Sequence, residues 1–168
     1  MKKKIDFELT ADEKRVLKEK KVSVKMLQCN SLDEVAQLLK ASPQRTKEIQ
    51  ALADFQGIPS LGIGFAKELI GQGYYGLNEL HGKTAVELFD AYEKHCGCRA
   101  DPCVEDSYRL LVHFIEHRDV TKRWWDFTKE RKAYRERYGF PADRPALAWY
   151  ETGQFPKMKA FKARSLFS

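Results

Sequence analysis

Residues 55–66 run Phe-Gln-Gly-Ile-Pro-Ser-Leu-Gly-Ile-Gly-Phe-Ala, and few folds can accommodate such a segment. Apolar residues with helical spacing precede its turn, at Ile49, Leu52 and Phe55, and a second helical pattern follows it. Pro, Ser and Gly between two helical patterns are typical of a tight turn. The segment therefore predicts two helices joined by a short hairpin, which is a helix-hairpin-helix.

The hairpin can be aligned in two registers. Gly-Ile-Gly at 62–64 is the more conspicuous turn. Pro-Ser-Leu-Gly at 59–62 fits better, because Ala66 then stands four residues after the glycine of the turn. A small residue at that position lets the second helix pack closely against the first. In this register we expect Leu61 to fill the space between the helices and Gly64 to lie inside the second helix.

Helix signals also dominate the rest of the chain, and no segment shows the sustained alternation of a strand. Ser or Thr followed by Glu three residues later is a capping box, which marks a helix start. Such boxes begin at Thr10, Ser31 and Thr84, two more starts have Ser or Asp before Pro at residues 42 and 101, and a sixth helix is expected over 121–138. We therefore predict an all-α fold: a compact helical bundle built on helix-hairpin-helix units, with a helical C-terminal extension.

A faint internal repeat bears on whether there is one such unit or two. Residues 24–35 and 77–88 each contain a short apolar turn, then a capping box, then the start of an amphipathic helix. Two copies would suit a tandem helix-hairpin-helix. Chance similarity between capped helices explains the repeat equally well.

The formal net charge of +6 is unevenly distributed. Residues 1–27 carry nine Lys/Arg and five Asp/Glu, residues 28–118 carry nine and thirteen, and residues 119–168 carry twelve and six. The stretch that holds the hairpin is therefore acidic, and the basic excess lies at the two ends. We predict a helix-hairpin-helix core with an N-terminal capping helix over 1–118. We predict a basic, aromatic extension over 119–168, which packs on the core and ends in loose residues.

A hairpin of this kind presents backbone N–H groups and a helix N-terminus, which together suit an anion such as phosphate. The expected function is sequence-independent binding of nucleic acid, with DNA as the first candidate and RNA as the second, aided by the basic ends. The candidate contacts are Ser60, Leu61, Gly62 and Gly64, with Lys67 as the nearby cation. The acidic surroundings favour an alternative, in which the hairpin is structural and the chain is a protein-binding adaptor.

Aromatic and basic residues are interleaved near the C-terminal end, over 122–137 and again over 157–164. Cations can follow a phosphate backbone while aromatic rings stack on bases. We expect Trp124, Trp125 and Phe127 to cap the core instead, and the cations to make a weak contribution to nucleic-acid binding.

Four cysteines raise the question of thiol or metal chemistry, which is the third class of function considered. Cys103 lies at a helix start, where the helix dipole favours a reactive thiolate. Neighbouring carboxylates and the frequent burial of cysteine favour a packing role instead. His95, Cys96, Cys98 and Cys103 are candidate zinc ligands, but the spacing Cys-x-Cys-x4-Cys matches no common zinc pattern. No metal or cofactor is therefore predicted.

Apart from the thiol of Cys103, little in the sequence indicates an enzyme, because neither a Ser-His-Asp arrangement nor a phosphate loop is found. The N-terminus is basic but lacks the apolar run of a signal peptide, and no window is long and apolar enough to cross a membrane. We therefore expect a cytoplasmic, non-enzymatic protein with reduced cysteines and no membrane partner.

An ordered set of motifs runs through the middle of the chain. Its members are Ile-Pro-Ser-Leu-Gly at 58–62 with Ala66 and Leu69, Leu-x-x-Leu-x-Gly at 77–82, Asp101-x-Cys103-Val104, Arg109, and Trp124-Trp125. With this set the chain resembles the pathogenicity locus family of small bacterial helix-hairpin-helix proteins over about residues 45–127. The resemblance implies that fold and an association with nucleic acid, and it transfers no catalytic residue. Cys96, Cys98 and the aromatic, basic C-terminus depart from the family pattern.

Overall fold

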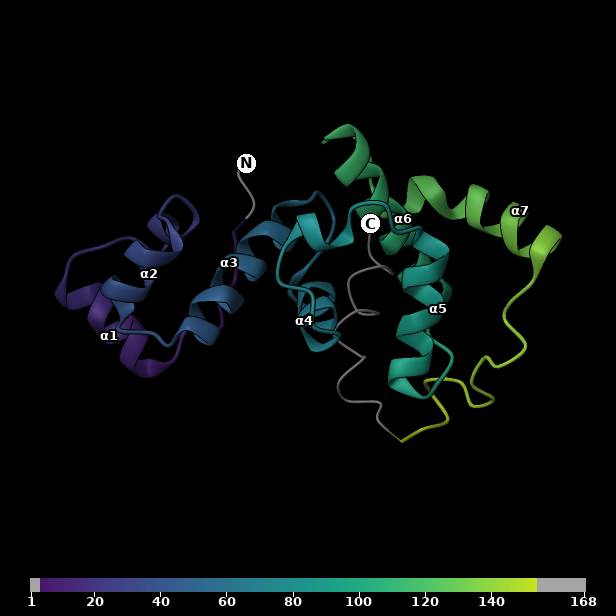
Figure 1. Ribbon diagram of the computed structural model, residues 1–168, viewed down its shortest axis with the longest axis horizontal. Helices are drawn as coiled ribbons and strands as arrows, with labels where there is room; N and C mark the ends of the chain where they lie inside the picture. The colour runs from purple at the N-terminus through teal and green to yellow at the C-terminus, as the bar shows by residue number, and fades with distance from the viewer. Residues whose placement is uncertain (1–3, 154–168) are drawn as a thin grey trace. The chain divides into compact units, whose positions relative to one another are not determined.

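The structure, a computed structural model, describes residues 4–153 (Figure 1). These residues form helices and 3-10 turns without a strand, so the all-α prediction is confirmed. None of the described helices is both long and apolar enough to span a membrane. The elements are, in order, α1 (Ala11–Glu19), η1 (Val24–Gln28), α2 (Leu32–Leu39), α3 (Pro43–Gly57), α4 (Ile63–Gly71), η2 (Leu77–Leu80), α5 (Ala85–Cys96), α6 (Pro102–His117), η3 (Trp124–Phe127) and α7 (Thr128–Tyr138).

The chain divides into two compact units, Met1–Glu79 and Leu80–Ser168, and each is described by itself. The domain boundary predicted between residues 118 and 119 lies inside the second unit. That unit holds α5, α6 and α7 together. The loose end expected for the last residues lies outside the described residues.

The helix starts follow the capping signals of the sequence. Thr10, Ser31 and Thr84 each accept a hydrogen bond from the N–H three residues later, and the glutamate there bonds back to the N–H of the cap residue. Residues 42 and 101 cap α3 and α6, and Pro follows each of them. The sequence predicts a sixth helix over 121–138, but α7 begins only at Thr128, because the residues before it form the separate 3-10 turn η3.

Both copies of the internal repeat have the same local structure. In the first copy the 3-10 turn η1 precedes the capping box of α2, and in the second copy η2 precedes that of α5. The apolar turn and the capped helix that the repeat predicts are therefore present in each copy.

Helix α3 forms the centre of the first unit. Its residues Ile49, Leu52 and Phe55 are buried, as their spacing predicts. The N-terminal segment lies along this helix, because Gln56 Nε2 donates to the Asp6 carbonyl at 2.6 Å and the Asp6 N–H donates to Gln56 Oε1 at 3.1 Å. The segment before α1 is thus fixed beside the last turn of α3, immediately before the hairpin.

A partly buried ion pair secures the same segment. Arg45 Nε donates to Glu13 Oε1 at 2.9 Å, and Arg45 Nη2 donates to the Phe7 carbonyl at 3.0 Å. The hydrogen bond from Arg45 is the largest of the effects that lower the pKa of Glu13. Arg45 binds the charged form of the Glu13 carboxylate. The ion pair therefore stabilises the folded protein fully above the unfolded-state pKa of Glu13, and this stabilisation is lost as the pH falls through the lowered folded-state pKa.

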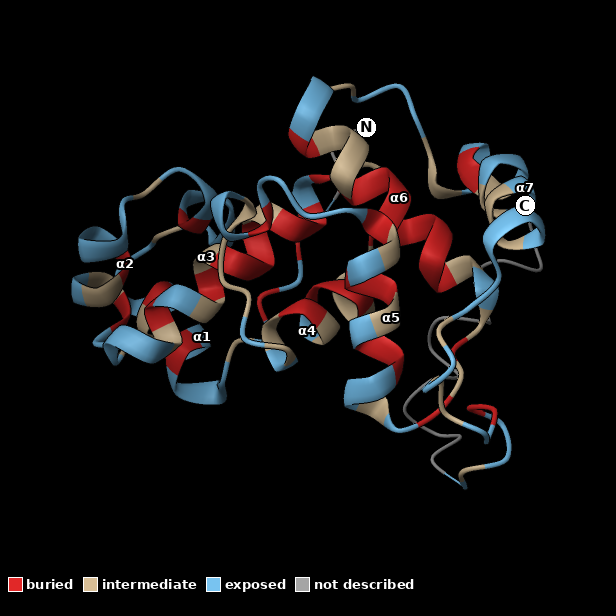
Figure 2. Ribbon diagram, turned by 45° about the vertical axis from the view of Figure 1, so that its right-hand side comes forward, coloured by how far each residue is buried: buried red, intermediate tan, exposed pale blue. Residues whose placement is uncertain are grey.

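Helix α6 is the central helix of the second unit, and most of its length is buried (Figure 2). Tyr108, Leu110 and Leu111 have no exposed surface. The Tyr108 ring contacts the rings of Phe89 and Tyr92 on α5, with ring centroids 6.4 and 5.9 Å away. Aromatic and aliphatic packing between α5 and α6 therefore forms the apolar core of this unit.

Helix α7 docks on the second unit through ion pairs, since it contains no buried residue of its own. Arg131 Nε lies 2.7 Å from Asp106 Oδ1, and Arg135 lies 2.9 Å from Glu105 and 2.7 Å from Asp90. The side chains of Glu105 and Asp106 are only 1% exposed. Acidic residues of α5 and α6 thus pair with basic residues of the C-terminal stretch, which explains much of the charge separation along the sequence.

The segment after α7 is held in a similar way. Arg144 Nη2 donates to Glu93 Oε1 at 2.8 Å, and the same oxygen accepts the Ala100 N–H at 2.8 Å. An isolated backbone bridge pairs Arg99 with Ala148. The described part of the basic extension therefore packs on the helices that precede it in the second unit.

Candidate functional sites

The turn between α3 and α4 follows the Pro-Ser-Leu-Gly register. Gly62 is the N-cap of α4 with φ −99° and ψ −179°, and Gly64 lies within the helix. Ser60 adopts the left-handed region with φ 61°. Leu61 is 1% exposed and its N–H donates to the Ile58 carbonyl at 3.3 Å, so the Leu61 side chain belongs to the core and its amide is used inside the turn.

The N-terminus of α4 has no side-chain cap. Side-chain oxygens cap α1, α2, α3, α5 and α6, but the N-cap of α4 is a glycine and supplies none. The positive end of the helix dipole therefore meets no capping oxygen, and an external anion is favoured there. A Cβ atom added at Gly62 would meet no atom within 4 Å, so the space beside this residue is open.

Lys67, the cation expected beside the hairpin, is engaged by a carboxylate. Its Nζ lies 2.8 Å from Glu8 Oε1, and the two side chains are 53% and 48% exposed. An exposed pair of this kind contributes little free energy, so an incoming phosphate could compete for Lys67. Sequence reasoning missed this pairing because the two residues lie 59 positions apart.

The aromatic residues of η3 are not all buried in the core, contrary to the prediction from the sequence. Phe127 is buried, but Trp125 is 53% exposed and Trp124 is only half-buried, so the prediction that all three cap the core is wrong for Trp125. The four-residue turn η3 directs only one large ring fully inward. The cations nearby fall into two groups: Lys122, Lys129, Lys132 and Arg137 are exposed, whereas Arg131 and Arg135 are paired with buried carboxylates.

The cysteines do not gather into a metal site. Cys98 is buried, Cys96 ends α5, and Cys103 lies in the first turn of α6. Within residues 4–153, no three His, Cys, Asp or Glu side chains are grouped as ligands, so the proposed zinc set of His95 with these cysteines is not assembled. Burial raises the pKa of the Cys103 thiol, and the hydrogen bond to Asp101 raises it further. Both effects oppose a thiolate at this position.

We expect alkylation to separate Cys103 from an ordinary thiol. At neutral pH, Cys103 should react with iodoacetamide at least about tenfold more slowly than Cys29, because the thiolate is the nucleophile and the pKa of Cys103 is raised. Cys29 is exposed and serves as the internal control in the same chain. Mass spectrometry of peptides from timed reactions measures both rates, and equal labelling would restore the reactive-thiol hypothesis.

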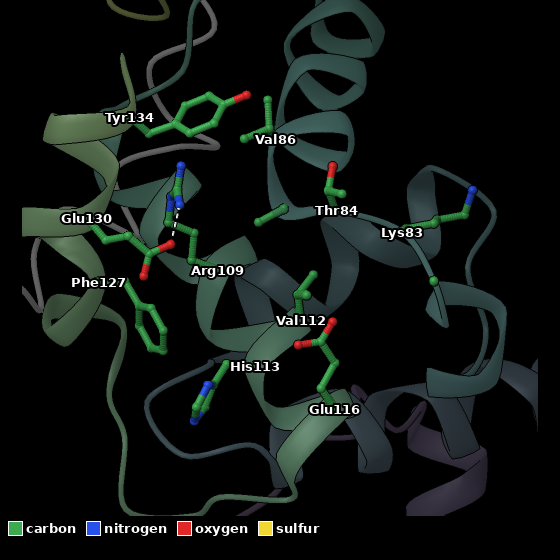
Figure 3. Close-up of a pocket in the computed structure, with 12 residues that line it drawn as sticks. Lys83, Thr84, Val86, Arg109, Val112, His113, Glu116, Phe127, Glu130 and Tyr134 are labelled. Atoms are coloured by element: carbon green, nitrogen blue, oxygen red, sulfur yellow. Dashed lines mark hydrogen bonds and ion pairs between the residues drawn. The ribbon is translucent and has the colours of Figure 1, made fainter. Parts of the chain in front are cut away.

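The second unit contains a pocket of about 470 Å³ (Figure 3). Its walls come from the start of α5, one face of α6 and the residues from η3 into α7. Arg109, His113 and Glu130 are among its charged and polar lining groups, and Phe127 and Tyr134 supply aromatic rings. Gly82 and Arg109 belong to the motif set of the sequence, but that set did not indicate a pocket, because the lining is spread between residues 82 and 134.

Together, these features define a small protein whose described residues are all helical. One unit has a tight turn followed by a helix without a side-chain N-cap, and the other has a pocket lined by an arginine. A family model described as Cdd1, Pathogenicity locus, matches residues 48–133, which is about half of the 168-residue chain. The chain therefore belongs to the pathogenicity locus family, and the resemblance seen in its motifs is confirmed. No curated protein and no solved structure matches it.

Proposed function

We propose that this chain is a cytoplasmic bacterial protein that binds nucleic acid, with DNA as the partner, through the turn between α3 and α4. The observation that carries the proposal is the N-terminus of α4, which has no side-chain cap and has open space beside Gly62. Backbone N–H groups at such a terminus recognise phosphate without reading the base sequence. The turn is then a helix-hairpin-helix in the functional sense, with Ser60, Gly62 and Gly64 as its backbone contacts.

The basic ends can make further contacts with nucleic acid, each within its own unit. In the first unit, the hydrogen bonds between Asp6 and Gln56 fix the N-terminal segment beside the end of α3, and Lys4 in that segment is exposed. In the second unit, the exposed ring of Trp125 lies in a stretch with the exposed Lys122 and Lys129. Stacking on a base and pairing with phosphate both suit such a surface.

Salt dependence tests the proposal. The affinity for a fluorescent DNA duplex, measured by anisotropy, should fall steeply with rising salt, with a log–log slope of about −0.9 for each phosphate neutralised. Glu8→Gln should raise the affinity about two- to fivefold, because it releases Lys67 from an exposed ion pair. The control Asp33→Asn removes one negative charge from an exposed position on α2 and should change the affinity little. No measurable binding of DNA at low salt would refute the proposal.

A protein-binding adaptor is the second candidate, and exposed apolar side chains favour it. Val120, Trp125 and Tyr138 are 61%, 53% and 60% exposed in the second unit. Tryptophan and tyrosine are enriched at protein interfaces. An adaptor would leave DNA unbound at every salt concentration, so the same titration distinguishes the two functions.

A further inference from the structure

The pocket in the second unit is large enough for a small molecule. Its volume of about 470 Å³ falls within the usual range for such sites. Val86 and Val112 form apolar walls, and Figure 3 shows the Tyr134 side chain extending toward Val86. Phe127 adds a second ring lower in the same view. An apolar or aromatic body can therefore be accommodated.

Arg109 gives the pocket a fixed cationic group. Its side chain is 6% exposed, with Nη2 3.0 Å from Glu105 Oε1 and Nη1 2.6 Å from Glu130 Oε1. The guanidinium lies over the Tyr134 ring, 5.3 Å from its centroid. Arg109 Nε is buried and has no hydrogen-bond partner among the described residues. Arg109 is thus pre-positioned, and the protein leaves part of its hydrogen-bonding capacity unused.

The two glutamates that hold Arg109 are not equivalent. Glu105 is 1% exposed and also bonds Arg135, so it is a permanent part of the unit. Glu130 is 64% exposed and can turn into solvent. A pair with such an exposed partner contributes little, so an anion from outside can take the place of Glu130 on Nη1.

The other charged groups among the lining residues leave the pocket suited to an anion. Lys83 supplies a second cationic side chain among the lining residues, next to the N-terminus of α5, which Thr84 and Glu87 already cap. His113 is engaged with Asp119 at 3.2 Å, and the carboxylate of Glu116 is exposed. Glu116 and Glu130 are the two carboxylates among the lining residues, and Glu130 is the one whose place on Arg109 an anion can take.

The geometry points to a binding site for a small molecule that carries one carboxylate or phosphate group on an apolar or aromatic body. The anionic group replaces Glu130 at Arg109, and the body packs between Val112 and the rings of Phe127 and Tyr134. All of these residues belong to the second unit, so the site does not depend on the proposed nucleic-acid contact at α4.

The test is an NMR titration of the full chain, observed at the Arg109 side-chain Nε–H and the Val112 methyl groups. The probes are benzoate and adenosine monophosphate, with benzyl alcohol and adenosine as their neutral counterparts. At least one anionic probe should shift both signals and saturate with a Kd of about 1 mM or tighter, and its neutral counterpart should bind at least about tenfold more weakly. Saturation by benzoate alone assigns a carboxylate ligand, and saturation by adenosine monophosphate alone assigns a phosphate ligand.

Two substitutions complete the test. Glu130→Gln removes the carboxylate that competes with the ligand for Arg109. For the anionic probe that binds, the Kd should fall about fivefold, which corresponds to the free energy of an exposed ion pair. Glu136→Gln is the matched control, because it removes an exposed glutamate of the same helix that does not line the pocket. The proposal is overturned if neither anionic probe moves the Arg109 signal, or if Glu130→Gln binds no more tightly than Glu136→Gln.

Discussion

Replacing Glu105 with glutamine is expected to destabilise the second unit by about 3–5 kcal/mol, the usual cost of removing one partner from a buried ion pair. The Glu105 carboxylate joins Arg109 at 3.0 Å and Arg135 at 2.9 Å, and its side chain is 1% exposed. The glutamine amide keeps one oxygen that can accept from one guanidinium, but its NH2 group faces the other guanidinium, which is itself a donor. Arg109 and Arg135 then lose the buried charge that they share and keep only Glu130 and Asp90 as charged partners.

Urea unfolding of the full chain measures this loss, and hydrogen exchange of the α7 amides shows where it acts. Because α7 has no buried residue and docks through these pairs, its amides should lose protection before those of α6. The control Glu136→Gln changes the same residue type at an exposed position of α7 and should stay within about 0.5 kcal/mol of the parent chain. A Glu105→Gln variant as stable as this control would show that the network is not needed to hold α7.

The second large effect is expected at the turn before α4. Gly62→Asp should lower the affinity for DNA about tenfold or more, while the stability rises by a few tenths of a kcal/mol. The extended backbone of Gly62, with φ −99° and ψ −179°, suits an aspartate N-cap, and the added side chain has open space. Its carboxylate would accept the first-turn N–H groups of α4 and repel phosphate from them.

Gly62→Asp is informative because the affinity for DNA should fall while the stability rises. A damaged fold cannot explain a loss of binding in a more stable protein. Gly76→Asp is the matched control: it makes the same change at another glycine of the first unit with open space around its Cβ position. Gly76→Asp should weaken DNA binding only slightly, through the general repulsion between one added negative charge and DNA. If both variants bind DNA equally, the turn is not the contact site.

The helices and the turn could be predicted from the sequence because their signals are local. A capping box such as Thr84 with Glu87 satisfies backbone N–H groups within one turn, whatever the rest of the chain does. The assignment of Pro-Ser-Leu-Gly as the turn likewise rested on neighbours, and the burial of Leu61 agrees with it. The start of α7 was missed because the helical spacing over 121–138 does not distinguish a 3-10 turn from an α-helix.

The candidate sites were harder to predict because they depend on distant pairings. The basic residues after position 118 suggested a surface for nucleic acid, yet Arg131 and Arg135 bind carboxylates of α5 and α6. Lys67 was expected to face phosphate, and it lies against Glu8. A count of charges along the chain contains no information on which side chains meet after folding. The motif set includes Arg109, but nothing in the sequence indicated a pocket around it.

The attachment of α7 through charged groups also has a thermal consequence. Hydration of charged groups becomes less favourable on heating, so the penalty for keeping Glu105 and Asp106 away from water falls as the temperature rises. The stabilisation from apolar burial levels off over the same range. Warming therefore favours the arginine–carboxylate attachment of α7 relative to an equivalent attachment by leucine or valine, and α7 is suited to stay in place at elevated temperature.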